Sequence, residues 1–411
     1  MVYKKALTIS KTVEKDLCIN CGLCKYTCPK NAIELKENNY KEYTPVINRK
    51  KCIDCSLCYN VCPNTPEKMK NEALKCKKAL SRTSFGSEGF HYLAWDNNNQ
   101  KRLKSASGGA ITKLASYLLE NKHIDGVIHI ERIFSSKGKP HYKACISKTL
   151  EEIDLEERKS SAYQPIDFSE ILAQAEEGKT YLITATPCVI RGIKNLNTKA
   201  KFITCALICS HNTNTSFADY LADSLNIKEH DYYINFRNKD NIDNANMYNT
   251  HFYTKEMDII KKNRFLTGWT SMWRKHYFAM NACLYCSDLW GREADISVKD
   301  AWGKWAKEDK LGKSIVIIRD KNLKNIFTNC GLEIEDLEPN LFEEHQKATS
   351  IYKQSEAYNK NFRPIFSKNN IKNGHLQNIL IMKTSKFLYK NFGYKITSTI
   401  MNIIEFLIGV K

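Results

Sequence analysis

The sequence predicts a small cysteine-rich α+β unit followed by a larger α/β unit with a mixed sheet. Eight cysteines fall within residues 18–62, in two copies of one spacing, and short apolar segments follow each copy. From about residue 91 onward, segments of strand length alternate with segments of helical periodicity, as in an α/β layer. A chain of 411 residues is long enough for both units.

The two copies of the cysteine motif read CINCGLCKYTCPK and CIDCSLCYNVCPN. This is the cysteine run by which bacterial ferredoxins bind 4Fe–4S clusters, and its fourth cysteine ligates the cluster of the other copy. The motif therefore predicts two clusters with exchanged fourth ligands. One set of ligands is Cys18, Cys21, Cys24 and Cys62, and the other is Cys52, Cys55, Cys58 and Cys28.

Zinc and disulfide bonds are the alternatives for these cysteines. Structural zinc takes four ligands in two pairs, whereas this chain has a triplet plus one, twice. A disulfide scaffold would need export, and residues 1–10 lack the apolar region of a signal peptide. With sixteen cysteines, we expect clusters and a reducing, cytoplasmic compartment.

The net charge of +18 favours acidic or anionic partners. An acidic electron donor, an anionic cofactor and an anionic lipid surface all fit, while lysines spread over solvated faces are the simpler explanation. We expect no nucleic-acid binding, because the chain lacks a basic recognition helix and an aromatic RNA-binding pattern. No apolar run reaches the length of about 18 residues that a membrane span needs.

We expect four segments along the chain. Residues 1–66 would form the dicluster domain, with a lead-in strand at 1–15 and short strands at 32–35 and 45–47. Residues 67–90 would be a linker that begins as a polar helix and holds a structural cysteine, Cys76. The α/β unit would span residues 91–365, and residues 366–411 would be a basic, amphipathic helical tail.

Within the α/β unit, the patterns predict helices at 110–120, 169–177 and 215–225 and from about 189. They predict strands at 126–132, 142–147, 180–186, 201–209, 295–298 and 314–319, and a β-rich region at 231–260. Ser107 is the expected N-cap of the helix at 110–120. Cysteines that fall inside these patterns are expected in the core, namely Cys145, Cys205 and Cys330.

Four further cysteines stand where a third metal site would form. Cys188 and Cys209 each follow a predicted strand, and Cys283 and Cys286 form a C-x-x-C pair. Ligands of α/β proteins bind beyond the carboxyl ends of the strands. The spacing alone leaves three alternatives open: a third iron–sulfur cluster, zinc, and buried cysteines without a ligand.

The tail at residues 375–411 is apolar and basic. Its apolar side chains recur at helical spacing, at Ile396, Ile400, Ile403, Ile404, Leu407 and Ile408. One alternative is a helix that docks on the core or on a second copy. The other is a helix that lies on an anionic membrane, which would place the protein peripherally at the inner face.

Beyond the cysteine runs, the chain contains SASGGAITKLASYLL, SSAYQPID, ATPCVIRGIK, ICSHNT and CLYCSDLWGREADISVKDAWG, in this order. The ordered set covers roughly residues 15–330 and resembles the coenzyme F420 hydrogenase/dehydrogenase beta-subunit family. Members of this family are flavoproteins with iron–sulfur clusters, and many bacterial members are encoded in surface-polysaccharide gene clusters. The resemblance implies an α+β ferredoxin-like dicluster domain followed by an α/β flavin-binding domain with a mixed sheet.

The resemblance also implies site residues. It makes Cys188, Cys209, Cys283 and Cys286 ligands of a third 4Fe–4S cluster. It places FAD beside Ser107, Gly108, Gly109, Asp295, Ser297, Asp300 and Trp302. Candidate catalytic proton donors there are His211, Asp300 and Tyr163, although a histidine in a polar turn is more often merely exposed.

Four departures from the family's pattern concern the flavin side. Ala162 stands where the family has lysine, Val189 where it has glutamine, and Lys299 where it has glycine. Residues 209–213 read CSHNT where the family has cysteine–histidine–glycine–valine–proline. These differences weigh against a deazaflavin substrate, and they weigh against flavin binding more than against the clusters.

These observations favour an iron–sulfur flavoprotein oxidoreductase. It would pass electrons between a ferredoxin-type or deazaflavin donor and a small-molecule or sugar-linked substrate, through 4Fe–4S clusters and FAD. Surface-polysaccharide biosynthesis is the expected setting. The first alternative is an electron-transfer subunit without a substrate of its own that feeds a partner enzyme. The second is a non-redox helper that keeps only structural clusters.

Overall fold

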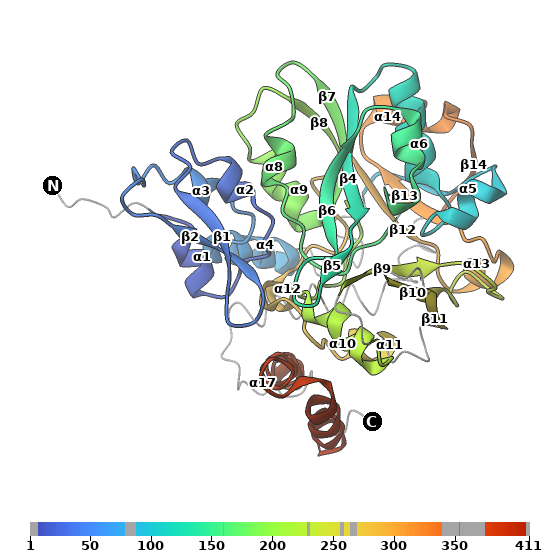
Figure 1. Ribbon diagram of the computed structural model, residues 1–411. Coiled ribbons are helices and arrows are strands. Elements are labelled where there is room, and N and C mark those ends of the chain that lie inside the picture. Colours follow the sequence, from blue (N-terminus) through green and yellow to red (C-terminus); the bar gives the residue numbers. More distant parts are fainter. Residues whose placement is uncertain are drawn as a thin grey trace.

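The computed structural model describes residues 7–78, 88–158, 160–227, 231–254, 259–263, 269–338, 353 and 375–407. Figure 1 shows the N-terminal cysteine-rich module beside a larger α/β body, with the C-terminal helix α17 below both. The expected mixed α/β architecture is therefore confirmed.

The N-terminal module has a repeated build. Each cysteine run continues into a short helix, α2 (Leu23–Tyr26) in the first copy and α3 (Leu57–Val61) in the second. Strands β1 (Ile33–Glu37) and β2 (Tyr43–Ile47) pair antiparallel between the two copies. Helix α4 (Pro66–Lys78) then leads away from the module.

The prediction of a lead-in strand at residues 1–15 is wrong. Residues 10–14 form helix α1 (Ser10–Glu14), and residues 1–6 lie outside the described part of the chain. Ile9 and Thr12 are three positions apart and both buried, and this is the spacing of one helical face. The short segment therefore covers the cysteine loops with a helix rather than with a strand.

An eight-stranded mixed sheet forms the centre of the α/β body, in the order β14-β3-β13-β12-β8-β7-β4-β6. Strands β12, β8, β7 and β4 run parallel, and β13, β3, β14 and β6 pair antiparallel with their neighbours. The bounds are β3 (Phe90–Asp96), β4 (Gly126–Arg132), β6 (Tyr142–Ser147), β7 (Thr180–Ala185), β8 (Lys201–Leu207), β12 (Ile296–Asp300), β13 (Ser314–Ile318) and β14 (Leu332–Asp336).

Helices cover one face of this sheet, and the N-terminal module is packed on the other. On the first face, α6 (Ala110–Glu120) and α14 (Lys321–Asn329) bury Leu114 and Phe327 against the strands. On the other face, Leu23 and Val61 of the module share a core with α9 (Pro187–Lys194) and with Ile183 of β7. This shared core places the cysteine runs next to the carboxyl ends of the parallel strands.

The remaining helices are short and connect the strands. They are α5 (Asn99–Lys104), α7 (Leu150–Asp154), η1 (Glu156–Arg158), α8 (Ser169–Leu172), α10 (Ser216–Ser224), α11 (Trp269–Arg274), α12 (Asn281–Tyr285) and α13 (Lys304–Glu308). The strands expected in the α/β unit are confirmed with small shifts of their ends, whereas α8 is shorter than the helix expected at 169–177. Helix α9 begins at Pro187, two residues early, because proline at the first helical position needs no N–H partner.

The β-rich region expected at 231–260 is confirmed as part of a second, antiparallel sheet. Its strands are β5 (Ser135–Ser136), β9 (Asp231–Asn238), β10 (Asn249–Thr254) and β11 (Ile259–Asn263), in the order β11-β10-β9-β5. The three cysteines expected in the core are buried, as is Cys76. One detail is wrong: the N-cap of α6 is Gly109, at φ 78, whereas Ser107 donates its hydroxyl to the carbonyl of Lys313.

Helix α17 (His375–Leu407) docks on the core, which is the first alternative for the tail. Gly393, at φ 67 and ψ −169, divides it into two helical parts. Ile381, Leu388 and Met401 are buried against the core around α10. Among the described residues, no helix is both long and apolar enough to cross a bilayer.

Candidate metal and cofactor site

The structure brings one cysteine set together at the outside of the N-terminal module. Cys28 of the first run lines a small cavity, of about 20 Å³, with the triplet of the second run, Cys52, Cys55 and Cys58. Burial raises the pKa of the Cys58 thiol, and the neighbouring thiols of Cys55, Cys28 and Cys52 raise it further. Cys28 of the first run therefore lies beside the triplet of the second run, as an exchange of fourth ligands would require. We call this the outer set.

The second set, Cys18, Cys21, Cys24 and Cys62, lies on the side of the module that faces the α/β body. Burial raises the pKa of the Cys24 thiol, with added contributions from Cys18, Cys21 and Cys62. The hydroxyl of Thr12 in α1 lies 3.8 Å from Cys62 Sγ. We call this the inner set.

Equivalent residues shape the two cysteine loops. Asn20 and Asp54 are the third residues of their runs. Both have a left-handed backbone conformation, at φ 55 and φ 52. Gly22 and Ser56, at φ 75 and φ 62, repeat this conformation just before α2 and α3. Asn, Asp and Gly adopt this region more readily than other residues. These turns curl each loop so that backbone N–H groups reach sulfur, as Asn20 does at 3.4 Å from Cys18 Sγ.

The structure brings the third set of cysteines together at the edge of the large sheet. Cys188 lies in the first turn of α9 after β7, Cys209 follows β8, and Cys283 and Cys286 flank the end of α12. All four line one cavity of about 240 Å³. Burial raises the pKa of the Cys283 thiol, and Cys209 and Cys188 raise it further. We call this the third set.

The inner and third sets are neighbours. The charge of Cys188 is close enough to contribute to the raised pKa of Cys21, for which burial is the main cause. Among the described residues, no three His, Cys, Asp or Glu side chains converge tightly enough to hold a single metal ion. The assignment of each set to a 4Fe–4S cluster stays a prediction.

Two buried cations lie beside the third set. Lys353 donates from Nζ to the carbonyl oxygens of Cys209, at 2.8 Å, and Asp288, at 3.3 Å. Burial lowers the pKa of Lys353, but the thiols of Cys286 and Cys209 outweigh it, so that the net shift is upward. Arg191 of α9 is also buried, and its pKa is raised in the same way. Sequence reasoning missed Lys353, which belongs to no motif.

A second cavity, of about 610 Å³, shares Thr186, Cys209 and His211 with the cavity of the third set. It lies at the carboxyl ends of β8 and β12 and at the start of β13, where Leu207, Asp300 and Ser314 line it. Of the residues predicted for the flavin, this cavity is lined by Ser107, Gly109, Tyr163, His211, Asp300 and Trp302. Trp269, Trp273 and Tyr248 complete an aromatic wall.

Three predicted cofactor contacts do not line this cavity. The N–H of Gly108 donates to Ser314 Oγ at 3.1 Å, and a Cβ on Gly108 would meet the carbonyl oxygen of Ala94 at 2.7 Å. Asp295 accepts from the N–H of Thr204 at 2.7 Å. Ser297 is fully buried and donates to the carbonyl of Trp290 at 2.6 Å. Their role as cofactor contacts stays a prediction from the resemblance.

Positive charge gathers around the aromatic wall. Arg237 of β9 pairs with Asp300 and lies over the rings of Tyr248, at 4.7 Å, and Trp302, at 5.1 Å. Burial lowers the pKa of Lys299 to about 8, against the opposing charge of Asp300. Arg274 also lines the cavity. The cavity is therefore suited to a flat, anionic ligand.

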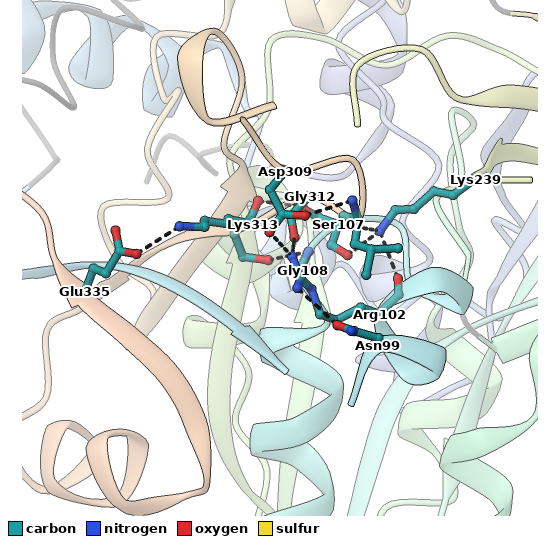
Figure 2. A network of polar contacts seen from close by, with 11 residues as sticks. Asn99, Arg102, Ser107, Gly108, Lys239, Asp309, Gly312, Lys313 and Glu335 are labelled. Atoms are coloured by element: carbon teal, nitrogen blue, oxygen red, sulfur yellow. Dashed lines mark hydrogen bonds and ion pairs between the residues drawn. The ribbon is translucent and has the colours of Figure 1, made fainter. Parts of the chain in front are cut away.

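A polar network fixes the loop that bears Ser107 (Figure 2). Lys239 donates to the carbonyl oxygens of Ser107, at 2.6 Å, and Arg102, at 2.9 Å. Arg102 pairs with Asp309 and donates to the carbonyl of Gly312 at 2.7 Å. Burial lowers the pKa of Lys239 to about 7. The network joins Lys239, which follows β9, to the loop that bears Ser107 and to the loop before β13 that bears Asp309 and Gly312. Sequence reasoning did not find this network.

His211 is buried, contrary to the simple expectation for a polar turn. Its ring stacks on Trp273, at 3.8 Å between centroids, and on His276, at 4.6 Å. Its Nε2 has no hydrogen-bond partner among the described residues. Burial holds the pKa of His211 well below its usual value, and the ring is therefore neutral. His211 lines both cavities, and its role as a proton donor stays a prediction.

Comparison with protein families matches three stretches of the chain. Residues 91–173 match the N-terminal region of the coenzyme F420 hydrogenase/dehydrogenase beta subunit, and residues 178–339 match its C-terminal region. The chain belongs to this beta-subunit family. Residues 11–69 match a 4Fe–4S dicluster domain, so this family member carries an iron–sulfur module at its N-terminus.

One solved structure similar to the chain comes from a xenon study of the F420-reducing NiFe hydrogenase complex of Methanosarcina barkeri. The two chains are 18% identical, and the match covers 68% of this chain and 94% of the other, with a TM-score of 0.48. No curated protein matches the sequence.

Proposed function

We propose that this family member is an iron–sulfur flavoprotein oxidoreductase, with its thiolate sets placed to carry electrons to or from the aromatic cavity. The observation that carries the proposal is the succession of sites. The outer, inner and third sets follow one another, and the third set shares a wall with the cavity. Thiolate-bound clusters move electrons singly, and a flavin exchanges single electrons for a hydride.

The chain's own residues fit both kinds of group. Twelve cysteines in three sets supply the thiolates, and Arg191 and Lys353 offset negative charge at the third set. The aromatic wall and the cations Arg237 and Lys299 suit FAD, whose ring is flat and whose diphosphate is anionic. In this proposal His211 holds or moves a proton at Nε2, while Asp300 fixes Arg237 over the ring of Trp302.

The substrate is proposed to be a small or sugar-linked molecule with an anionic group. The cavity carries three cations, Arg237, Arg274 and Lys299, against one carboxylate, Asp300. A role in surface-polysaccharide biosynthesis fits this charge, because activated sugars and sugar acids are anionic.

A second candidate is an electron-transfer subunit that serves a partner enzyme and has no substrate of its own. It is favoured by the three departures that contribute to the cavity lining, namely Ala162, Lys299 and the segment 209–213. Ala162 removes a lysine that the family has, and Lys299 adds a lysine where the family has glycine. The cavity would therefore hold flavin differently, or the partner enzyme would bind the flavin instead.

The test is the cofactor content of protein purified without oxygen. We expect about twelve irons, about twelve sulfides and flavin per chain, and Cys188→Ser should lower the iron to about eight. Cys145→Ser is the matched control, because Cys145 is a buried cysteine outside the three sets. It should leave the iron content unchanged.

The outcomes separate the candidates. Flavin together with turnover of an anionic substrate supports the first. Full iron content without flavin or turnover supports the electron-transfer subunit. Protein without iron and sulfide contradicts both.

We also propose that the exposed face of α17 lies on an anionic membrane surface. Its exposed apolar side chains are Leu380, Phe387, Phe392, Ile396, Ile403 and Leu407. Lys383, Lys390 and Lys395 are exposed beside them. An apolar face bordered by lysines is the pattern of an interfacial helix.

A further inference from the structure

The outer set lies open to solvent at the far end of the molecule. Cys55 is exposed, whereas the other eleven predicted ligands are buried or half-buried. Figure 1 places α3, which follows Cys55, on the side of the module away from α5 and α14. An electron that enters or leaves through the module has its shortest route to the surface here.

The surface around this cysteine is apolar at its centre. Ile53 and Leu57 line the cavity of the outer set and are 56% and 41% exposed. Pro29 lines the same cavity and is exposed. Side chains of this size are costly to leave in water, and their position over a thiolate set indicates a contact surface.

Positive charge surrounds this apolar centre. Arg49, Lys50 and Lys51 stand in the exposed loop before Cys52, and Lys30 lies at the cavity of the outer set. The acidic group at this cavity is Asp54, which pairs with Arg49 at 3.6 Å between the charged atoms. Lys30, Lys50 and Lys51 therefore remain to attract a negatively charged partner.

We propose that this face docks an acidic, one-electron carrier protein of the ferredoxin or flavodoxin class. We define the outer docking face as Pro29, Lys30, Arg49, Lys50, Lys51, Ile53, Cys55 and Leu57. The proposal rests on the electron-transfer function above. Electrostatic attraction brings the carrier to the face and orients it, and the small apolar centre suits the brief complexes of redox partners.

The step moves one electron and no atoms. The carrier loses one electron, the centre held by the outer set gains it, and no bond forms or breaks. In the reverse direction the same face returns the electron to the oxidised carrier.

The experiment uses the full chain and a bacterial 4Fe–4S ferredoxin of net negative charge as the probe. Lys50→Glu/Lys51→Glu reverses two charges of the docking face. Lys104→Glu/Lys321→Glu makes the same change in net charge on the exposed far side of the molecule. Binding of the oxidised ferredoxin is measured by calorimetry, and electron transfer from the reduced ferredoxin is measured by stopped-flow absorbance.

At low ionic strength, Lys50→Glu/Lys51→Glu should weaken binding and slow electron transfer by about tenfold or more. The loss should shrink at high salt, which screens exposed charges. The Lys104→Glu/Lys321→Glu protein should behave like the parent. Reduced methyl viologen, a small cation, should still reduce both variants, which shows that the metal centres are intact.

Equal effects of the two double variants would overturn the proposal, because net charge and not this face would then govern binding. Unchanged binding in Lys50→Glu/Lys51→Glu would overturn it as well. Weaker adsorption of that variant to phosphatidylglycerol vesicles, with unchanged ferredoxin binding, would make the face a lipid contact instead. Iron and sulfide analysis of each protein tests the proposed function separately, and calorimetry decides docking even if the metal content is low.

Discussion

Lys353 and Arg191 place two positive charges in the interior beside the third set, where an uncompensated charge would be strongly destabilising. In the proposed cluster four thiolates would supply the opposite charge, and the buried carboxylate of Asp288 lies near both cations. Local sequence pattern does not predict Lys353, because the cysteines beside it lie in other segments, whereas Arg191 stands three residues after Cys188 in α9. At this scale, the sequence predicted the ligands but not the charges that accompany them.

His129 of β4 makes the stability of the protein depend on pH. Burial lowers its pKa to about 4, and Nε2 lies 2.7 Å from Ser147 Oγ. The unfolded chain binds the proton near pH 6.5 and the folded chain does not, so stability falls as pH drops from 6.5 toward 4. Between pH 7 and pH 5 we expect the parent to lose about 2 kcal/mol more than His129→Gln.

Denaturant unfolding without oxygen at the two pH values measures this difference. Because both proteins carry the same clusters, acid lability of the clusters cancels in the comparison. His123→Gln is the control, since His123 is exposed and should follow the parent. A variant His129→Gln as pH-sensitive as the parent would contradict the prediction.

At the scale of elements, helix α17 shows how one helix can have two apolar faces. One face is fixed to the protein by Ser385, by an ion pair of 2.6 Å between Lys386 and Glu42, and by Tyr389, whose hydroxyl donates to Asp223 at 2.6 Å. The other face stays exposed. The periodicity of the tail therefore predicted a helix correctly. It did not predict which of the apolar residues would pack against the core.

Charge placed on the exposed face of α17 should reduce its attraction to lipid. We expect Phe387→Glu/Ile403→Glu to reduce sedimentation with phosphatidylglycerol vesicles by about tenfold, because two apolar contacts are replaced by like charges. Both side chains are about half exposed, so the fold should tolerate the change. Leu103→Glu, at an exposed apolar position on α5, is the control. Unchanged sedimentation of the double variant would remove α17 as the membrane contact.

For the whole molecule, the N-terminal module depends on two sources of stability. It is too small to bury a large core of its own, and it shares one with α9 and β7 through Leu23 and Val61. A Cβ on Gly192 of α9 would lie 2.2 Å from Leu23 Cδ1, which shows how closely the two parts meet. Clusters would supply the remaining cross-links.

Removal of iron should therefore loosen the module before the α/β body. After chelation without oxygen, we expect faster amide hydrogen exchange over residues 7–66, while β7 and β8 in the buried sheet keep their protection. Hydrogen exchange with mass spectrometry measures both regions in one sample. Equal loss of protection over the whole chain, or none at all, would contradict the prediction.

The sequence by itself determined the features that depend on short-range spacing. These are the two cysteine runs, most strands and helices between residues 110 and 319, and the family. The tertiary structure alone decided which distant segments meet. It brought Arg237, Lys239 and Lys353 to the site, left Gly108, Asp295 and Ser297 outside the cavity lining, and stacked His211 on Trp273. The physical reason is that spacing fixes contacts within one turn or one strand, whereas contacts between segments far apart arise only when the shared core is packed.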